Sequence, residues 1–362
     1  MLRRGAFVAA STGAAAIVAS CASRTHAGWT FAPSQSGVPP FVPASASPSA
    51  VATAAASAPA PSSPSPTQAH EPAGSPSASP GARDPSPADI AVPPAYRPHQ
   101  SAPVEFSLES FDGPGESILI APGTPFASMN FARQVPAPTL RVTQGDKVRF
   151  TLTNRGNAVH SIDFHAARTP WDRNYQDVKP GQTFSFDWTA QDPGVFMYHC
   201  GSQPVLMHVG DGMYGAVIVD PKDGRPAARE YLLVQSEFYG AGGDYQALLN
   251  DPPVVVAFNG QAFRYRAAPL PVTAGEPLRI FLMNAGPNNV SAFHVIGAVI
   301  DHYEPDGNPA NAQGTHQTVE VLPGGGAMVE LTSPDAGRYP FVTHKMNDLE
   351  KGAFGLFEVT TG

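Results

Sequence analysis

The chain is poor in cysteine and in charge. Only two cysteines, Cys21 and Cys200, occur among 362 residues, which excludes a scaffold held together by disulfides. Charged residues make up 14% of the chain, and the net charge of −8 argues against a nucleic-acid partner. Long apolar segments with a period of 3.6 residues are also absent from the sequence, which argues against a helical bundle.

The first twenty residues have the pattern of an export signal. Arg3 and Arg4 precede a short apolar run, as in secretory signal peptides, and the arginine pair is a feature of twin-arginine signals. Residues 18–21 resemble a bacterial lipobox, so we expect lipidation of Cys21; an incidental cysteine is the alternative. Either interpretation predicts an exported protein, periplasmic or at the cell surface, that meets the membrane only through a lipid anchor.

Residues 21–100 form a segment rich in alanine, serine and proline. The segment holds 17 of the 40 prolines and only six charged residues, and it offers too little apolar surface to build a core. We therefore expect a disordered linker here. The remaining residues, 101–362, are numerous enough for two domains.

Short β-type runs separated by Gly and Pro fill the body of the chain. They lie at 147–152, 183–188, 195–199, 216–219, 279–283, 328–331 and 356–359. This spacing is typical of β-sandwiches or barrels. A weak repeat relates residues 142–145 to residues 272–275. The sequence therefore predicts an all-β fold of two tandem domains, 101–222 and 223–362.

Soft metal ligands gather around the second cysteine. His199 precedes Cys200, His208 and Met213 follow, and His160 lies upstream. Two imidazoles and a thiolate bind copper in a trigonal plane, with a thioether weakly on the axis, and this arrangement suits electron transfer. We predict such a copper site at His160, Cys200, His208 and Met213. A buried free cysteine among unrelated histidines is the alternative, and a structural zinc site would more often use paired cysteines.

A second set of histidines is predicted to point away from the thiolate. An odd spacing on one strand puts His160 and His165 on opposite faces, and the neighbours His199 and Cys200 alternate in the same way. His165 and His199 would then share a surface, and His344, the counterpart of His199 in the repeat, would be a third ligand from the same or a neighbouring chain. Three histidines with an open position are the usual form of a catalytic metal site. The alternative is that all three are ordinary surface residues.

Asp163 and His294 are candidates for proton delivery. Asp163 lies two residues before His165 and shares its face, and His294 opens the matching region of the second repeat. A carboxylate and an imidazole beside an open metal site can supply protons. The alternatives are that Asp163 orients a histidine ligand and that His294 is a satisfied core residue.

Four segments of the chain resemble the ligand blocks of the two-domain copper nitrite reductases. They are residues 160–167, residues 198–215, residues 292–297, and residues 342–344 together with 350–353. The resemblance implies two cupredoxin-like Greek-key sandwiches, with type 1 copper in the first. It implies the following site residues: His160, Cys200, His208 and Met213 for type 1 copper, His165, His199 and His344 for type 2 copper, Asp163 and His294 for catalysis, and Ile296 in the substrate pocket.

The same resemblance implies an assembly and a reaction. The chain would form a homotrimer in which His344 of one copy completes the type 2 site of the next. An electron from a small donor protein, such as a cytochrome c or a cupredoxin, would enter at the Cys200 copper and pass through His199 to the second copper. Nitrite would be reduced there to nitric oxide, with protons from Asp163 and His294.

One segment departs from this family, and two other functions stay open. Residues 168–175, Arg-Thr-Pro-Trp-Asp-Arg-Asn-Tyr, replace a Gly-rich stretch near the substrate cavity, so another small substrate for the type 2 site is one alternative. An exported carrier lipoprotein holding only the Cys200 copper is the other. A laccase-like oxidase is excluded, because the sequence has no His-x-His pair for a three-copper cluster.

Overall fold

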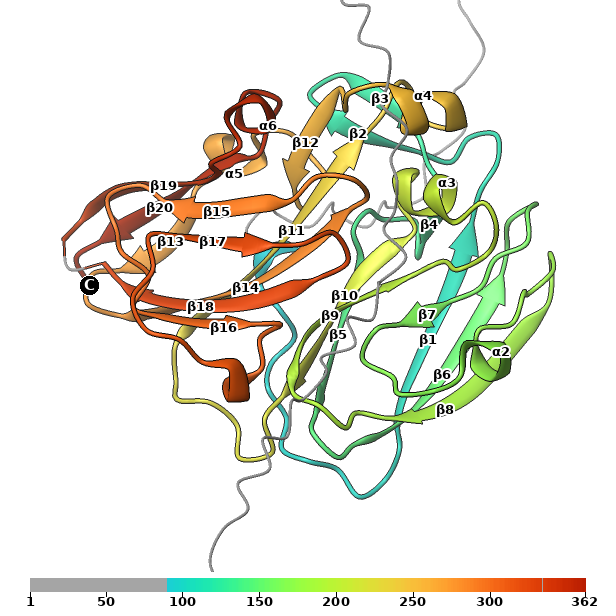
Figure 1. The fold of residues 1–362 in the computed structure, drawn as a ribbon, viewed down its shortest axis with the longest axis horizontal. Helices are drawn as coiled ribbons and strands as arrows, with labels where there is room; N and C mark the ends of the chain where they lie inside the picture. Colours follow the sequence, from blue (N-terminus) through green and yellow to red (C-terminus); the bar gives the residue numbers. More distant parts are fainter. Residues whose placement is uncertain (1–89, 334) are drawn as a thin grey trace, which may run out of the picture. The chain divides into compact units, whose positions relative to one another are not determined.

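A computed structural model describes residues 90–333 and 335–362 of the chain (Figure 1). The predicted signal peptide at 1–20, the lipidation candidate Cys21 and the linker up to residue 89 lie outside the described residues. Within the described part the fold is all-β, as predicted, and consists of two sandwiches. No helix in this part is long and apolar enough to cross a membrane.

The first sandwich precedes residue 222 and the second follows it. The first contains β1 (Val104–Phe111), β2 (Ser117–Ala121), β3 (Thr124–Ala127), β4 (Asn130–Phe131), β5 (Ala137–Thr143), β6 (Lys147–Asn154), β7 (Asp163–Phe164), α2 (Trp171–Asn174), β8 (Thr183–Thr189), β9 (Gly194–His199), α3 (Val205–Gly210) and β10 (Tyr214–Asp220). The second contains β11 (Arg229–Phe238), α4 (Tyr245–Asn250), β12 (Val255–Phe258), α5 (Arg264–Ala267), β13 (Leu270–Thr273), β14 (Pro277–Gly286), β15 (Ser291–Val295), β16 (His302–Pro305), the 3-10 helix η1 (Pro309–Asn311), β17 (Thr318–Val321), β18 (Gly326–Thr332), β19 (Gly337–Thr343), α6 (Met346–Glu350) and β20 (Phe354–Thr360).

The two sandwiches share one strand order, and each sheet of the second has one additional edge strand. The first pairs its strands as β4-β1-β6-β8 and β5-β10-β9-β7, and the second as β12-β11-β14-β18-β16 and β13-β20-β19-β15-β17. Strand pairs β1–β6 and β5–β10 are parallel, and so are their counterparts β11–β14 and β13–β20. The predicted repeat therefore corresponds to equivalent places in the fold, because residues 142–145 lead into β6 and residues 272–275 lead into β14.

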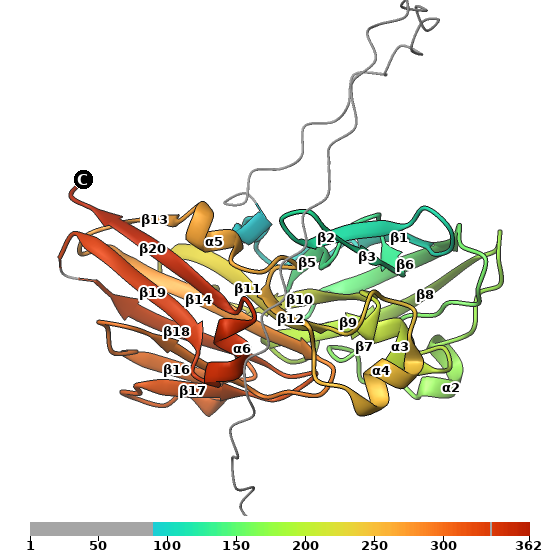
Figure 2. The ribbon, with the colours of Figure 1, turned by 90° about the horizontal axis from the view of Figure 1, so that it is seen from above.

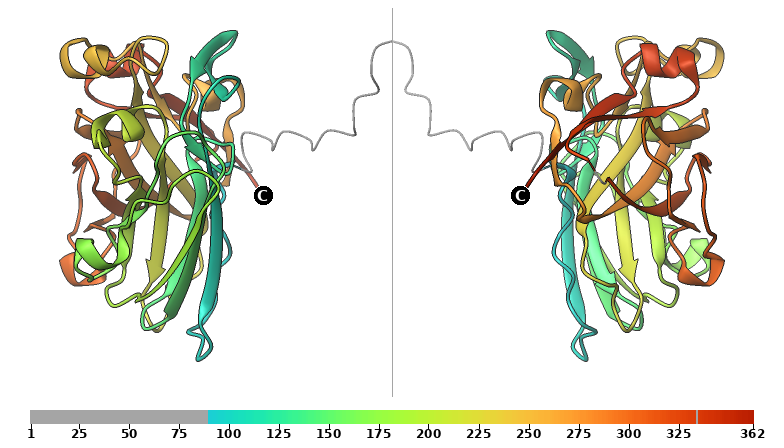
Figure 3. Two further views of the ribbon diagram at one scale, coloured as in Figure 1. Left: turned by 90° about the vertical axis from the view of Figure 1, so that its right-hand side faces the viewer. Right: turned by 90° about the vertical axis from the view of Figure 1, so that its left-hand side faces the viewer.

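Alternation along the strands builds the cores. In β6 the buried residues Val148, Phe150 and Leu152 alternate with more exposed ones, as expected for a strand with one face on the core. Strand β10 is buried at every residue, because its second face is covered as well. Val217 faces the first core, and Ile218 faces a different cluster that lies between the sandwiches. Figure 3 shows the layers edge-on.

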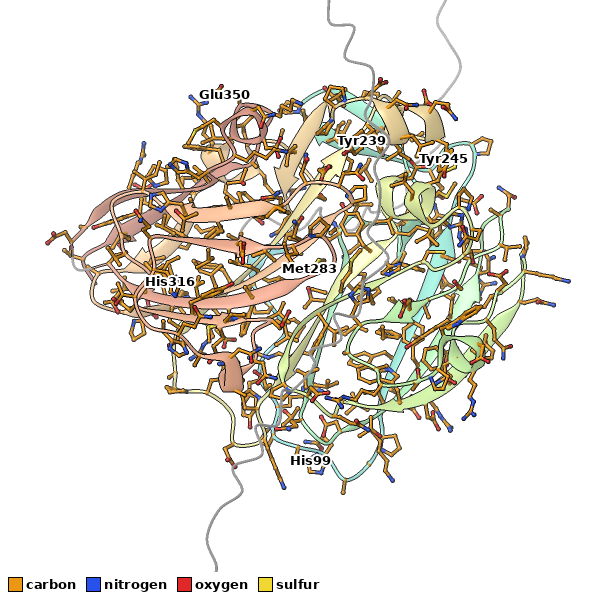
Figure 4. The ribbon with its side chains drawn as sticks, in the orientation of Figure 1. His99, Tyr239, Tyr245, Met283, His316 and Glu350 are labelled. Carbon is orange, nitrogen blue, oxygen red and sulfur yellow. The ribbon has the colours of Figure 1, made fainter. Side chains whose placement is uncertain are left out.

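That intervening cluster joins the two sandwiches. Val195 and Ile218 of the first sandwich pack with Leu232, Phe281 and Met283 of the second. Met283 is buried on β14 (Figure 4). The shared apolar core makes the two sandwiches one packed unit rather than two domains on a tether.

A buried ionic network runs along the same junction. Arg141 on β5 donates to Asp220 at 2.7 Å and to Glu230 on β11 at 2.6 Å. Arg279 on β14 donates to Glu230 at 2.8 Å and to Glu330 at 2.7 Å. Burial would raise the pKa of Glu230, but the two guanidinium groups outweigh it and hold that pKa below its usual range.

The packed part of the chain begins before the predicted boundary at residue 101. Ala91 is fully buried in the core of the second sandwich. The carbonyl of Pro94 accepts a hydrogen bond from Arg141 at 2.8 Å, and His99 contacts Asp146 at 2.7 Å on the first sandwich (Figure 4). Residues 91–99 therefore bridge the two sandwiches, which composition alone does not indicate.

Candidate metal centres

Four predicted ligands meet at one end of the first sandwich. His160 forms an isolated bridge with Val178, and Cys200 directly follows β9. His208 lies in α3, and Met213 directly precedes β10 (Figure 2). The connection from β9 to β10 thus contains a short helix, which carries His208.

The ligand atoms of three of these residues converge. The Sγ atom of Cys200 lies 3.0 Å from Nδ1 of His208 and 3.9 Å from Nδ1 of His160. The two Nδ1 atoms are 3.3 Å apart. All three residues are buried. Two imidazoles and a thiol around one point are the donor set that copper takes in electron-transfer sites, so these residues fit a type 1 copper.

Burial tunes these ligands for metal. It lowers the pKa of His160 and lowers that of His208 to about 4, so both imidazoles stay neutral with a free lone pair. Burial raises the pKa of the Cys200 thiol, although the Ser161 N–H, 3.4 Å from Sγ, opposes this effect. Metal binding must therefore displace the thiol proton.

Met213 is held beside this cluster by the backbone. The Cys200 N–H donates to the Met213 carbonyl at 3.0 Å, and the Met213 N–H donates to the His208 carbonyl at 3.0 Å. Met213 is fully buried and packs in the same core as Cys200. Met207 packs instead against Tyr239 and its neighbours, on the other side of α3. The structure thus brings Met213, rather than Met207, to the cysteine.

A second cluster lies on β7 and β9. The Nε2 atoms of His165 and His199 are 3.1 Å apart, and Asp163 Oδ2 lies 3.8 Å from Nε2 of His199. The three residues form a group with ligand atoms close enough to share one metal ion. The inference that one strand carries both His160 and His165 is wrong, because β7 covers only Asp163–Phe164 and His160 is an isolated bridge.

Hydrogen bonds fix the orientation of both histidines. Nδ1 of His165 lies 2.9 Å from the Gly324 carbonyl, and Nδ1 of His199 lies 2.9 Å from the Cys200 carbonyl. A carbonyl only accepts, so each Nδ1 carries the proton and each Nε2 presents a lone pair. Two lone pairs that face each other repel, and a metal ion that binds both removes this repulsion. This arrangement fits a metal held by Nε2 atoms.

The remaining predicted residues lie elsewhere in the chain. His344 directly follows β19, and its ring lies 5.6 Å from that of His294 on β15. Nδ1 of His294 is 2.5 Å from the Gln317 carbonyl. The structure therefore brings His294 and His344 together on the second sandwich, and neither belongs to the group formed by Asp163, His165 and His199.

The two groups resemble the halves of one site. His165 and His344 are both exposed, in contrast to the buried ligands around Cys200. Ile296, the predicted pocket residue, is 45% exposed and follows β15 directly.

The unusual segment 168–175 forms a short helix. Trp171 begins α2 and is 76% exposed. The Thr169 hydroxyl donates a hydrogen bond to the Tyr175 hydroxyl at 3.0 Å, which ties the two ends of the segment together. The Tyr175 hydroxyl also lies 3.5 Å from the Phe164 carbonyl, one residue before His165. The segment thus lies beside the second cluster, as its place in the sequence implied.

The sequence did not single out several residues that support these ligands. Asp112 Oδ2 lies 2.6 Å from Nε2 of His160, so it fixes the proton there and leaves Nδ1 free. Backbone N–H groups of Asn157 and Ala158 hold Asp112 in place. Since 48 residues separate Asp112 from His160, no local sequence pattern marks the pair. The position of Asp112 directly after β1 is the one feature that could have indicated a role.

Comparisons with known proteins find copper proteins among the relatives of this chain. A multicopper oxidase family model matches residues 116–224. The copper-containing nitrite reductase of Neisseria meningitidis serogroup B is 33% identical over 283 residues, or 74% of this chain and 72% of the relative. The copper nitrite reductase structure from Nitrosomonas europaea is 38% identical, with a TM-score of 0.69 over 72% of this chain and 94% of that one. The Cu-containing nitrite reductase of Thermus scotoductus is 34% identical, with a TM-score of 0.67 over 71% and 61%.

Proposed function

The chain belongs to the copper-containing nitrite reductases, and from this premise we propose that it reduces nitrite to nitric oxide at a type 2 copper held by His165, His199 and the His344 of another copy. The observation that carries this proposal is the pair of Nε2 atoms, 3.1 Å apart, with Asp163 beside them. His165 of this pair is exposed and the His199 side chain is 13% exposed, so the Nε2 atoms are reached from the His165 side.

The reaction consumes one electron and two protons for each nitrite, and it forms nitric oxide and water. When bound, type 1 copper passes single electrons and type 2 copper binds nitrite as a Lewis acid. The chain contributes the connection between the two centres, because His199 of one cluster is bonded through its peptide to Cys200 of the other. The Nδ1–H of His199 also donates to the Cys200 carbonyl, so the electron has a short route.

Asp163 and His294 hold the protons in this proposal. Asp163 is partly buried and lies close to His199, so it can donate to a nitrite oxygen once nitrite is bound there. His294 is oriented by the Gln317 carbonyl at Nδ1, which leaves Nε2 to face the site when another copy approaches. Its neighbour Ile296 would then be an apolar wall of the nitrite pocket.

A homotrimer would complete the site. The exposed His344 and the partly buried His294 lie together on the second sandwich, and His165 is exposed on the first. A cyclic arrangement of three copies brings a second sandwich against a first sandwich at every contact. The electron donor in this proposal is a small protein such as a cytochrome c or another cupredoxin.

We also propose that the protein is exported and held to a membrane by a lipid on Cys21. The support is the apolar run that ends at Cys21 and the Pro-rich stretch that follows it. In extended form, such a stretch spans about 3.1 Å per residue, so it can act as a tether.

Two observations weigh against the alternatives. A carrier with only the thiolate copper gives no reason for the histidine pair that faces the surface with both Nδ1 atoms already bonded. A type 2 copper enzyme for another small substrate rests only on segment 168–175, where Trp171 points into solvent.

The direct test is anaerobic nitric oxide release by the copper-loaded protein, given nitrite and a reduced donor. We expect nitrite-dependent release at two coppers per chain, and none from His344→Ala at one copper per chain. Protein that holds two coppers per chain without releasing nitric oxide would contradict nitrite as the substrate. A protein that holds only one copper would favour the carrier.

A further inference from the structure

A buried polar cluster lies at the end of β11, outside both metal centres. We call it the acid cluster; its members are Glu237, Tyr239, Asn288 and Asp348. Glu237 is 1% exposed, Tyr239 is 3% exposed and Asp348 is fully buried. The Tyr239 hydroxyl donates to Glu237 and accepts from the Asn288 side chain at 2.8 Å. Tyr239 lies near α4 (Figure 4).

One side of the acid cluster holds the start of β15. The Glu237 carboxylate accepts hydrogen bonds from the backbone N–H groups of Asn288 at 3.2 Å and Asn289 at 2.6 Å. Ser291, the first residue of β15, donates to Gln235 at 2.6 Å. These bonds from β11 fix where β15 begins. They therefore also position His294, which lies on β15.

The other side of the acid cluster holds the start of α6. The Lys345 ammonium lies 3.1 Å from Asp348 Oδ2, and the Asp348 N–H donates to the Lys345 carbonyl at 2.8 Å. Among the described residues, neither Asp348 carboxylate oxygen has a hydrogen-bond partner, and the Lys345 ammonium forms an ion pair with Oδ2. A buried carboxylate with a single counter-charge is costly to separate from it. The pair therefore fixes the first turn of α6.

The N-cap of this turn, Lys345, is the residue after a predicted copper ligand. Lys345 directly follows His344, whose N–H donates to the Ala292 carbonyl on β15 at 2.6 Å. The His344 ring itself is exposed and contacts His294. The backbone that carries His344 is thus held on one side by β15 and on the other by the ion pair.

We propose that Asp348 is a positioning residue for the type 2 copper site. Through Lys345 it fixes the backbone on which His344 is presented to the neighbouring copy. Glu237 fixes the backbone that carries His294 through the start of β15. The acid cluster thus sets the distance between His294 and His344. This inference rests on the proposed function, because it takes His344 as a copper ligand.

The test compares the charge-removing variants Asp348→Asn and Lys345→Gln with the charge-preserving Lys345→Arg. Loss of a residue that orients a metal ligand typically lowers metal affinity by about 10–100-fold. We expect that loss at the type 2 copper for both charge-removing variants, with a changed type 2 electron paramagnetic resonance spectrum. The visible absorption of the type 1 copper should stay the same, and Lys345→Arg should restore the affinity.

The two losses should not add. In the double variant Asp348→Asn, Lys345→Gln we expect the affinity of Asp348→Asn and no further loss, because both substitutions remove one interaction and the double variant leaves no unpaired buried carboxylate. Glu350→Gln is the matched control, since Glu350 is exposed on the same helix (Figure 4). If Asp348→Asn fails to fold, Lys345→Gln decides the matter, because the Lys345 side chain is 38% exposed.

His344→Ala, measured in parallel, separates two kinds of failure. If His344→Ala loses type 2 copper while Asp348→Asn and Lys345→Gln keep wild-type affinity and spectrum, the positioning role is overturned and the proposed function stands. If His344→Ala keeps both coppers, the proposed ligand set is wrong and this inference falls with it.

Discussion

The neighbouring residues His199 and Cys200 belong to different clusters of candidate metal ligands. Successive side chains at a strand end point to opposite faces, so the thiol faces the buried cluster and the imidazole faces the surface. The hydrogen bond from His199 to the Cys200 carbonyl fixes this division at the level of one peptide. A single-residue shift in β9 would exchange the two environments and destroy both clusters.

Removal of the thiol should abolish the type 1 centre alone. Cys200→Ala leaves His165 and His199 in place, so we expect the protein to lose its intense visible colour and keep one copper per chain. Visible absorption and copper analysis check this result. Colour that persists in Cys200→Ala would show that the thiolate is not the ligand.

Removal of the Asp163 charge should affect turnover and not metal content. Asp163→Asn keeps the size of the side chain but cannot donate a proton, and loss of such a group typically costs about 10²–10⁴-fold in rate. We expect Asp163→Asn to hold two coppers per chain and to produce nitric oxide more slowly by about this factor. Asp172→Asn, on exposed α2, is the control. Unchanged turnover would leave Asp163 with a structural role only.

The junction between the two sandwiches is partly apolar and partly ionic. It is formed by strands β5, β10, β11 and β14. Arg141 and Arg279 place their guanidinium groups on Glu230, whose pKa is held below its usual range. An acid whose folded pKa is lowered stabilises the fold above its unfolded pKa, and this stability is lost as the pH falls through the folded value.

Glu230→Gln should therefore flatten the acid side of the stability curve. We expect wild-type stability to fall below about pH 4.3, the ordinary pKa of glutamate. The free energy of unfolding in urea, measured from pH 7 to pH 3, should fall less steeply in Glu230→Gln. The exposed Glu358→Gln serves as the control; equal slopes in all three proteins would contradict the role of the network.

The sequence predicts strands better than it predicts contacts between them. Period-two alternation marks β6, and Gly–Pro punctuation marks most others, because both follow from local backbone geometry. Spacing also indicates Cys200, His208 and Met213, which lie within one connection. Asp112, by contrast, meets His160 only after the strands have paired, and such a contact leaves no local pattern in the chain.

At the scale of the whole molecule, the two sandwiches share a core. Val195 and Ile218 from the first pack with Phe281 and Met283 from the second. The segment 91–99 adds further contacts to both. Neither sandwich can lose its packing at this junction without exposing apolar surface of the other, so we expect them to unfold together.

Met283→Ala should weaken both sandwiches at once. Truncation of a buried methionine typically costs about 2–5 kcal/mol. We expect the type 1 colour, a reporter of the first sandwich, and hydrogen exchange in β19, a reporter of the second, to shift to the same lower midpoint. Leu249→Ala, at an exposed leucine, is the control. Midpoints that separate would show two independent domains.

The separation of His344 from His165 within one chain has a genetic consequence. Two inactive alleles, one with His165→Ala and the other with His344→Ala, carry complementary lesions. If equal amounts of the two chains mix at random in a cyclic trimer, about one site in four receives both intact histidines. A cell that expresses both dead alleles would regain nitrite reduction, whereas a cell with either allele alone would not.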